Sequence, residues 1–279
     1  MDSGILYVVA TPIGNLQDCT LRAIDILKKV DLILAEDTRH SRKLLNTLSI
    51  HTPLRALHAH NEQHVTAGIV EQLQQGKSMA LVSDAGTPLL SDPGQFLVNT
   101  LWQEGIQLSP IPGPSALVTA WSVAGFSGRL VFEGFLPAKA TARQKILSSL
   151  QYESGTLAFY EAPHRFLATL NDLCNIFGAE REVLVARELT KLHEQLLRDS
   201  LGNALNWFTQ HADKCRGEFV LLVRGVSRDN EPKMDDLLSI LKPLLEELPL
   251  KQAVSLTSKI SGVAKNRIYQ EALRLRDAL

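Results

Sequence analysis

Residues 77–94, KSMALVSDAGTPLLSDPG, pass from an apolar run into a loop of glycine, proline and acidic residues. The run at 79–82 has the continuous apolar character of a strand buried on both faces. The loop that follows carries Asp84, Gly86 and Asp92. In α/β proteins the loops at the carboxyl ends of parallel strands surround the ligand crevice, and small residues let backbone groups approach a ligand closely. This stretch therefore predicts a parallel sheet with a binding site at one edge.

Strand-like runs alternate with helical spacing about five times in residues 1–125, which predicts an α/β domain with helices on the faces of a parallel sheet. The apolar runs occupy 5–10, 32–35, 54–57, 79–82 and 106–108. Each is followed by a loop rich in glycine, proline or polar groups: TPIGN (11–15), EDTRH (36–40), HAHNE (58–62), SDAGTP (83–88) and PGPSA (112–116). Because the carboxyl ends of parallel strands share one edge, we expect these loops to converge.

Residues 126–226 predict a second α/β domain that completes a cleft with the first. Its strand-like runs lie at 130–135, 156–160, 182–186 and 217–223, and the run at 194–198 is expected to pair with 182–186 in a partly antiparallel sheet. Residues 227–279 predict a small helical domain whose last two helices resemble a helix-turn-helix. The basic residues expected on its exposed positions form either a solvated surface or an RNA-binding one: Lys251, Lys259, Lys265 and Arg267.

The composition is that of a soluble globular protein. The chain has 279 residues, 45% of them hydrophobic, and a formal net charge of −1, so a nucleic-acid partner would require a local basic patch. The three cysteines are far apart and form no CxxC pair, which is typical of reduced thiols in a cytoplasmic protein. We expect no membrane partner, because no apolar run approaches the ~20 residues that span a bilayer.

Several common site chemistries have no motif in this chain. It has no GxxxxGK[ST], no GxGxxG after its first strand and no GxSxG, which disfavours a nucleoside triphosphate, a Rossmann-type dinucleotide and a serine hydrolase. We expect no metal, because His58 and His60 follow a strand whereas His64 falls inside a predicted helix. The remaining backbone groups and small side chains suit a neutral or zwitterionic ligand with a large planar part.

Four of these loops resemble the tetrapyrrole methylase superfamily: TPIGNL (11–16), AEDTR (35–39), SDAGTP (83–88) and PGPSA (112–116). Proteins of that superfamily hold S-adenosyl-L-methionine in a cleft between two α/β domains. The motifs EGFLP (133–137), YEAPHR (160–165) and RELTK (187–191) resemble its bacterial branch of ribose 2′-O-methyltransferases, which modify a cytidine of 16S ribosomal RNA. The resemblance implies this activity and cofactor, the small ribosomal subunit as partner, and a homodimer.

The resemblance also implies where the cofactor lies. It places the cofactor against Pro12, Gly14, Asp84, Ala85, Gly86, Pro88, Ser115, Ala116, Tyr160 and Leu189. A ribose hydroxyl is a poor nucleophile at neutral pH, so a base or a cationic neighbour should assist it. We expect Asp37 and Lys191 near the acceptor and assign Arg39 and Arg165 to phosphate, although each alone is equally compatible with a salt bridge or a helix cap.

Two other functions remain open from the sequence. The chain is also compatible with a C-methyltransferase that acts on a corrin or porphyrin precursor, as elsewhere in the superfamily. The charged loops EDTRH, YEAPHR and RELTK and the basic tail have no obvious use in that reaction. A non-enzymatic RNA-binding scaffold is the third possibility, and it would not bind S-adenosylmethionine.

Overall fold

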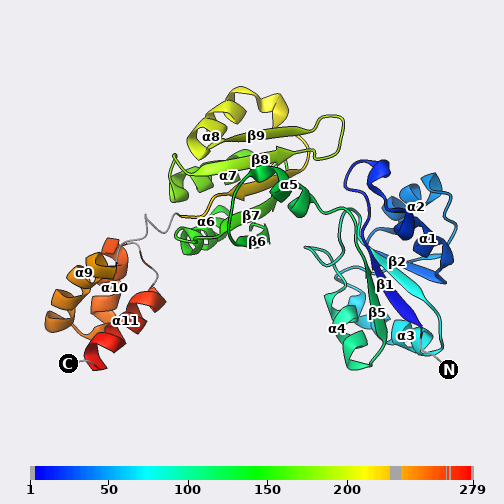
Figure 1. Ribbon diagram of the computed structural model, residues 1–279, viewed down its shortest axis with the longest axis horizontal. Coiled ribbons are helices and arrows are strands. Elements are labelled where there is room, and N and C mark those ends of the chain that lie inside the picture. The colour runs from blue at the N-terminus through cyan, green and yellow to red at the C-terminus, as the bar shows by residue number, and fades with distance from the viewer. Residues whose placement is uncertain (1–3, 227–233, 262, 264, 278–279) are drawn as a thin grey trace.

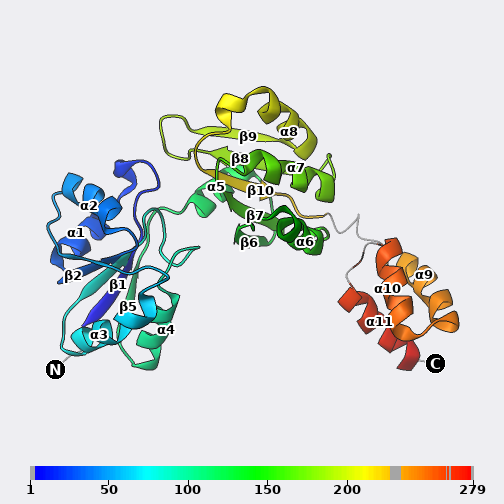
Figure 2. The same cartoon turned by 180° about the vertical axis from the view of Figure 1, so that it is seen from behind.

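The structure, a computed structural model, describes residues 4–226, 234–261, 263 and 265–277 (Figure 1). Two five-stranded sheets, each with its own helices, follow one another along the chain. Three further helices form a separate group, which Figures 1 and 2 show beside the part that holds the second sheet and remote from the first. The predicted fold class, two α/β units and a C-terminal helical region, is confirmed.

The first sheet is entirely parallel, with strand order β3-β2-β4-β1-β5. Its strands are β1 (Ile5–Val9), β2 (Leu32–Ala35), β3 (Leu54–Ala56), β4 (Met79–Val82) and β5 (Gln107–Ile111). The apolar side chains that alternate along them build a core on each face. Helices α3 (Glu62–Gln74) and α4 (Gln95–Gln103) cover one face, and α1 (Leu21–Lys29) and α2 (Thr38–Thr47) the other.

The loops at the carboxyl edge of this sheet meet as the sequence predicts. Thr11, after β1, and Gly86, after β4, form an isolated two-residue bridge in which each backbone N–H donates to the other's carbonyl, at 2.9 and 3.0 Å. Thr87 Oγ1 donates to the carbonyl of Pro114 after β5 at 3.0 Å. The loops TPIGN, SDAGTP and PGPSA are therefore fastened to one another by hydrogen bonds.

The second sheet has the order β6-β7-β10-β8-β9 and is partly antiparallel, as predicted. Its strands are β6 (Leu130–Phe135), β7 (Thr156–Glu161), β8 (Glu182–Arg187), β9 (Gln195–Ser200) and β10 (Phe219–Val223). The predicted pairing of the run at 194–198 with β8 is confirmed. The register between β6 and β7 shifts between Phe132 and Gly134, which marks a bulge in β6.

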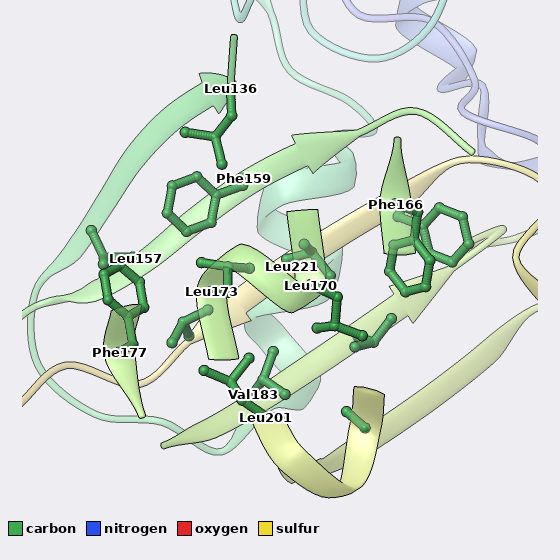
Figure 3. Packing of buried hydrophobic residues seen from close by; sticks show 14 of the residues in the cluster. Leu136, Leu157, Phe159, Phe166, Leu170, Leu173, Phe177, Val183, Leu201 and Leu221 are labelled. Atoms are coloured by element: carbon green, nitrogen blue, oxygen red, sulfur yellow. The ribbon is translucent and has the colours of Figure 1, made fainter. Parts of the chain in front are cut away.

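Helices α6 (Ala140–Leu150), α7 (Phe166–Phe177) and α8 (Leu201–Gln210) bury one face of this sheet. Figure 3 shows the core between them, with Phe166 beside Leu170 and Leu221. The other face is covered by α5 (Ala116–Ala124), which follows β5 in the chain but packs on β10. Helix α5 thus joins the two units, and the limits 1–125, 126–226 and 227–279 stay predictions.

The C-terminal region consists of α9 (Met234–Glu247), α10 (Leu250–Ser261) and α11 (Lys265–Asp277) around a small apolar core. Helix α9 continues through Pro243. None of the helices in the described residues is long and apolar enough to cross a bilayer.

Candidate functional site

Two cavities lie where the carboxyl-edge loops of the first sheet face the second unit. The first measures about 390 Å³, a size typical of small-molecule sites. Of the residues that the sequence assigns to the cofactor, its walls contain Asp84, Ala85, Gly86, Ala116, Tyr160 and Leu189. The sequence assigned no role to several other residues of its walls: Ile13, Thr87, Leu90, Ser91, Asp92, Phe135, Glu161, Ala162, Pro163, Ala186, Glu218, Phe219 and Val220.

The second cavity measures about 370 Å³, and polar residues form a larger share of its walls than of the walls of the first cavity. Pro12 and Gly14, which the sequence assigned to the cofactor, line this cavity and not the first. It also contains Lys191 from the RELTK loop together with His40 and Lys43 of α2. The two cavities share four wall residues: Ile13, Asp84, Ala85 and Glu218. They are therefore neighbouring chambers of one cleft.

The loop after β4 forms much of the first cavity and has an unusual backbone. Gly86 has φ +83°, which favours glycine, and Leu89 and Ser91 have φ 73° and 80°, which L-residues rarely adopt. The hydroxyl of Ser83 lies 3.3 Å from the carbonyls of Ala85 and Gly86 and helps to hold the turn. Strained backbone of this kind is kept where the surrounding structure enforces it, commonly at ligand sites.

Lys191 is held between two carboxylates. Its Nζ lies 2.8 Å from Glu188 Oε1 and 2.8 Å from Glu218 Oε2. Burial lowers the pKa of the ammonium group, but the two carboxylates outweigh this, and the pKa of Lys191 is raised above its ordinary value. Lys191 is therefore a fixed positive charge at neutral pH and not a proton acceptor.

Asp37, expected near the acceptor, and Arg39, assigned to phosphate, line neither cavity. The Asp37 carboxylate caps α2 by accepting from the backbone N–H of Arg39 and His40, and the first of these bonds is the main cause of its lowered pKa. The Arg39 side chain is 92% exposed. Their roles in acceptor binding stay predictions.

Arg165, assigned to phosphate by the sequence, belongs to a network behind the wall of the first cavity. Its Nη2 lies 2.7 Å from Glu161 Oε1, and its Nη1 donates to the carbonyl of Leu136. Glu161 is buried and also accepts from Thr169 Oγ1 at 2.5 Å. This network fixes the turn after β7, which carries Ala162 and Pro163 into the cavity wall.

Ser115 and Pro88, also assigned to the cofactor, are buried and do not line the first cavity. Ser115 is the N-cap residue of α5, and its buried hydroxyl lies beside the hydroxyl of Tyr160, a wall residue of the first cavity. Ser115 therefore supports a residue of the cavity wall, and its contact with the cofactor stays a prediction.

Asp92 is a wall residue that the sequence assignment missed, although it stands in the quoted run SDPG. Desolvation by burial raises its pKa to about 6, and the neighbouring carboxylates of Glu36 and Asp84 contribute to the rise, whereas the Ser83 hydroxyl opposes the shift. Glu36 itself has a raised pKa, chiefly through burial and Asp84. Carboxyl groups are thus concentrated in and beside the first cavity, with Asp84 and Asp92 in its wall and Glu36 near them.

The C-terminal helices expose Lys251, Lys259 and Lys265. The side chain of Arg267 lies outside the described residues. The predicted RNA contacts of this region stay predictions. Within the described residues, no group of three or more histidine, cysteine, aspartate or glutamate side chains could hold a metal ion.

Family models match nearly the whole chain. The model described as Tetrapyrrole (Corrin/Porphyrin) Methylases covers residues 5–205, and that described as RsmI C-terminal HTH domain covers residues 231–276. Among solved structures, a cobalt precorrin-4 methyltransferase of cobalamin biosynthesis aligns with TM-score 0.56 at 15% identity, covering 79% of this chain and 94% of that chain. A diphthine synthase aligns with TM-score 0.58 at 11% identity, covering 80% and 90%. At these identities the structures show the shared fold.

Closer relatives exist by sequence. The chain is 49% identical to the ribosomal RNA small subunit methyltransferase I of Pasteurella multocida over 97% of both chains. It is 47% identical to the protein of the same name from Pseudomonas aeruginosa over 98% of both. The resemblance expected from the loop motifs is therefore confirmed. The chain belongs to the tetrapyrrole methylase family and, within it, to the group of ribosomal RNA small subunit methyltransferase I proteins.

Proposed function

We propose that this protein transfers a methyl group from S-adenosyl-L-methionine to the ribose 2′-oxygen of a cytidine in 16S ribosomal RNA. The observation that carries the proposal is the 47–49% identity to small-subunit ribosomal RNA methyltransferases over nearly the full length of both chains. The matched region includes the C-terminal helices, which the model described as RsmI C-terminal HTH domain also matches.

The first cavity fits the cofactor. Its volume of about 390 Å³ lies within the range of small-molecule sites. Ile13, Leu90 and Leu189 supply apolar walls for an adenine ring, and the glycine-containing turn at 84–87 brings backbone groups to the same surface. The bound sulfonium would supply an electrophilic methyl group.

The second cavity fits the acceptor nucleotide. Because both cavities share Asp84 and Glu218, a ribose in the second would meet a methyl group in the first at their common wall. Lys191 stands in the second cavity with its positive charge secured by two glutamates. A fixed cation near the ribose hydroxyl stabilises the negative charge that develops on oxygen during transfer. Positioning of the two reactants in line supplies much of the remaining rate.

The surface beside the second cavity suits an RNA backbone. Helix α2 lines the second cavity with residues from His40 to Thr47. It exposes Arg39, His40, Arg42 and Lys43, and it contains no acidic residue. Exposed arginine and lysine side chains bind phosphates and release counterions, so such a surface strengthens RNA binding in a salt-dependent way. The exposed lysines of α10 and α11 offer a second basic surface: Lys251, Lys259 and Lys265.

We also propose that the protein acts in the cytoplasm and forms a homodimer. The cytoplasmic assignment is supported by three free cysteines and by the ribosomal substrate in the relatives' names. Light scattering on the purified protein tests the dimer, and a monomeric mass at micromolar concentration would contradict it.

The activity is tested with small ribosomal subunits from cells that lack this protein. Purified protein and S-adenosylmethionine labelled at the methyl group should place label in 16S RNA, and mass spectrometry of the nucleosides should identify 2′-O-methylcytidine. Label in a tetrapyrrole precursor and none in RNA would favour the second function. Replacing Lys251, Lys259 and Lys265 by alanine should weaken RNA binding and leave cofactor binding unchanged.

A further inference from the structure

The first cavity combines several carboxylates with no basic side chain. Asp84, Asp92, Glu161 and Glu218 line it, and none of its wall residues among the described ones is lysine, arginine or histidine. Buried or half-buried carboxylates are normally paired, because desolvation disfavours the charged form. A cavity with this charge therefore favours a ligand that brings positive charge with it.

Three of these carboxylates already have partners within the protein. Glu161 contacts Arg165 and Thr169, Glu218 contacts Lys191, and Asp84 accepts from the backbone N–H of Asp37 at 3.2 Å. Asp92 has no cationic partner in the described part of the chain. Asp84 has no cationic partner either, but it accepts a backbone N–H, whereas the favourable contact of Asp92 is the Ser83 hydroxyl alone.

The groups that face Asp92 do not neutralise it. Glu36 at the end of β2 and Asp84 at the end of β4 are like charges, and Tyr160 on β7 is neutral at physiological pH. Ser83 offers a hydroxyl, which is the one favourable contact. His58 acts electrostatically on Glu36. The burial of the Asp92 carboxyl and these neighbours explain why its pKa rises to about 6.

The position of Asp92 is fixed by its backbone. It lies in the loop between β4 and α4, directly after Ser91 with φ 80° and two residues before Gly94 with φ 122°. A Cβ on Gly134 of the β6 bulge would stand 3.0 Å from Ser91 Oγ, so the loop packs closely against the second unit. A carboxylate held this way is preorganised toward the cavity instead of relaxing into solvent.

Building on the cofactor-binding function proposed for this cavity, we propose that Asp92 is the counter-charge of the sulfonium of S-adenosylmethionine. Asp92 thereby makes the site prefer the methyl donor over the demethylated product. S-adenosylmethionine carries a sulfonium that S-adenosylhomocysteine lacks, while the amino acid and adenosine parts are the same. On transfer, the S–CH₃ bond breaks with its electron pair kept by sulfur, the O–CH₃ bond forms, and the hydroxyl proton passes to water. The attraction between sulfur and Asp92 disappears in that step, which favours product release.

The preference for the methyl donor predicts that donor binding depends on pH and that product binding does not. Because the sulfonium binds to the ionised carboxylate, binding below pH 6 must first remove a proton from Asp92. For one carboxyl with a pKa of about 6, the dissociation constant of the donor should rise about tenfold between pH 7 and pH 5. Binding of S-adenosylhomocysteine should change by less than about twofold over this range, because it carries no charge at sulfur.

The experiment is isothermal titration calorimetry of the full chain with both compounds at pH 5, 6, 7 and 8. Sinefungin, in which a carbon bearing an ammonium group replaces the methyl-sulfonium, should follow the donor. Asp92→Asn should weaken the donor and sinefungin at pH 7, leave the product unchanged and abolish the pH dependence. Glu36→Gln should move the pH dependence to lower pH, since a like charge is removed, and Asp25→Asn on the exposed face of α1 is the matched control.

Three outcomes would overturn the inference. Donor and product could show the same pH dependence, which would assign Asp92 to the ammonium group that both compounds share. Donor binding could be independent of pH, or Asp92→Asn could bind the donor normally with an unchanged circular dichroism spectrum. If none of the three compounds binds the wild-type protein at any pH, the proposed function itself fails.

Discussion

The side chain of Lys191 occupies the place that a Cβ on Gly14 would need, with Lys191 Cγ nearer to that position than van der Waals contact allows. Thr190 Oγ1 and Lys191 Cε, both within 3.1 Å of the same position, close the space further. The TPIGN loop of the first unit and the RELTK loop of the second therefore meet through a glycine. This contact sets the position of the ammonium group in the second cavity.

Gly14→Ala should displace Lys191 and reduce catalysis more than cofactor binding. A methyl group at this position must move the stem of Lys191 and with it the ion pairs to Glu188 and Glu218. We expect kcat to fall at least about tenfold, which corresponds to about 1.4 kcal/mol in the transition state. Steady-state kinetics and calorimetry measure the two effects. Gly68→Ala in α3, where a Cβ meets nothing within 4 Å, is the control and should keep full activity.

Lys191→Met keeps the aliphatic stem and removes the charge. We expect kcat to fall by roughly 100-fold, the size of effect seen when a group that stabilises charge in a transition state is lost. Lys191→Arg should restore part of the rate because it restores the cation. Since the pKa of Lys191 is raised, activity should show no loss from its deprotonation between pH 7 and pH 9. Lys28→Met, at the exposed end of α1, is the control. If Lys191→Met lowers kcat no more than Lys28→Met does, the charge of Lys191 has no role in catalysis.

Arg39→Ala and Arg42→Ala should weaken RNA binding at the start of α2. Both side chains are exposed, so the substitutions should leave thermal stability unchanged. For each phosphate that the protein no longer neutralises, the slope of log K against log salt should become shallower by about 0.7–0.9. Fluorescence anisotropy with an RNA fragment at several salt concentrations measures this slope. The pair Lys28→Ala and Lys29→Ala, at the far end of α1, should keep the wild-type slope.

The fold was predictable because its signals are local. Continuous apolar runs and helical spacing located the elements of both sheets, and the loop motifs placed the site at one edge. The division of that edge into two cavities was not predictable. Pro12 and Gly14 turn toward the second cavity, and Asp92 turns into the first through positive φ angles at Leu89 and Ser91, which non-glycine residues do not signal in sequence.

For the charged residues of the loops, the sequence left open whether each forms a helix cap, a salt bridge or a contact with the substrate. Asp37 begins a helix, and an N-cap is a common use of aspartate at that position. Arg165 pairs with Glu161 across the turn from β7 to α7. Both pairings depend on local geometry that residue type alone does not give. Glu218 was not recognised because its link to Lys191 joins the start of β10 to a loop 27 residues away in the chain.

Asp92→Asn should make the unliganded protein more stable at neutral pH. A carboxyl whose pKa is raised in the folded state holds its proton longer there than in the unfolded chain, so folding stability falls as pH rises from about 4 to about 6 and stays lower above that. Removing the charge should restore roughly 1 kcal/mol after allowance for solvent screening of a half-exposed group. That gain corresponds to a rise of about 2–4 °C in Tm.

The gain in stability from Asp92→Asn should shrink severalfold at pH 4. At that pH Asp92 is protonated in the folded protein, and the unfolded chain has begun to take up the same proton. Saturating S-adenosylmethionine should narrow or reverse the difference at pH 7, because a ligand that prefers the ionised carboxylate stabilises the wild-type protein more than the variant. Thermal melts at pH 4 and pH 7, with and without cofactor, test this. An equal gain in stability at both pH values would assign the effect to the backbone of the loop. The charge of Asp92 would then not destabilise the unliganded protein.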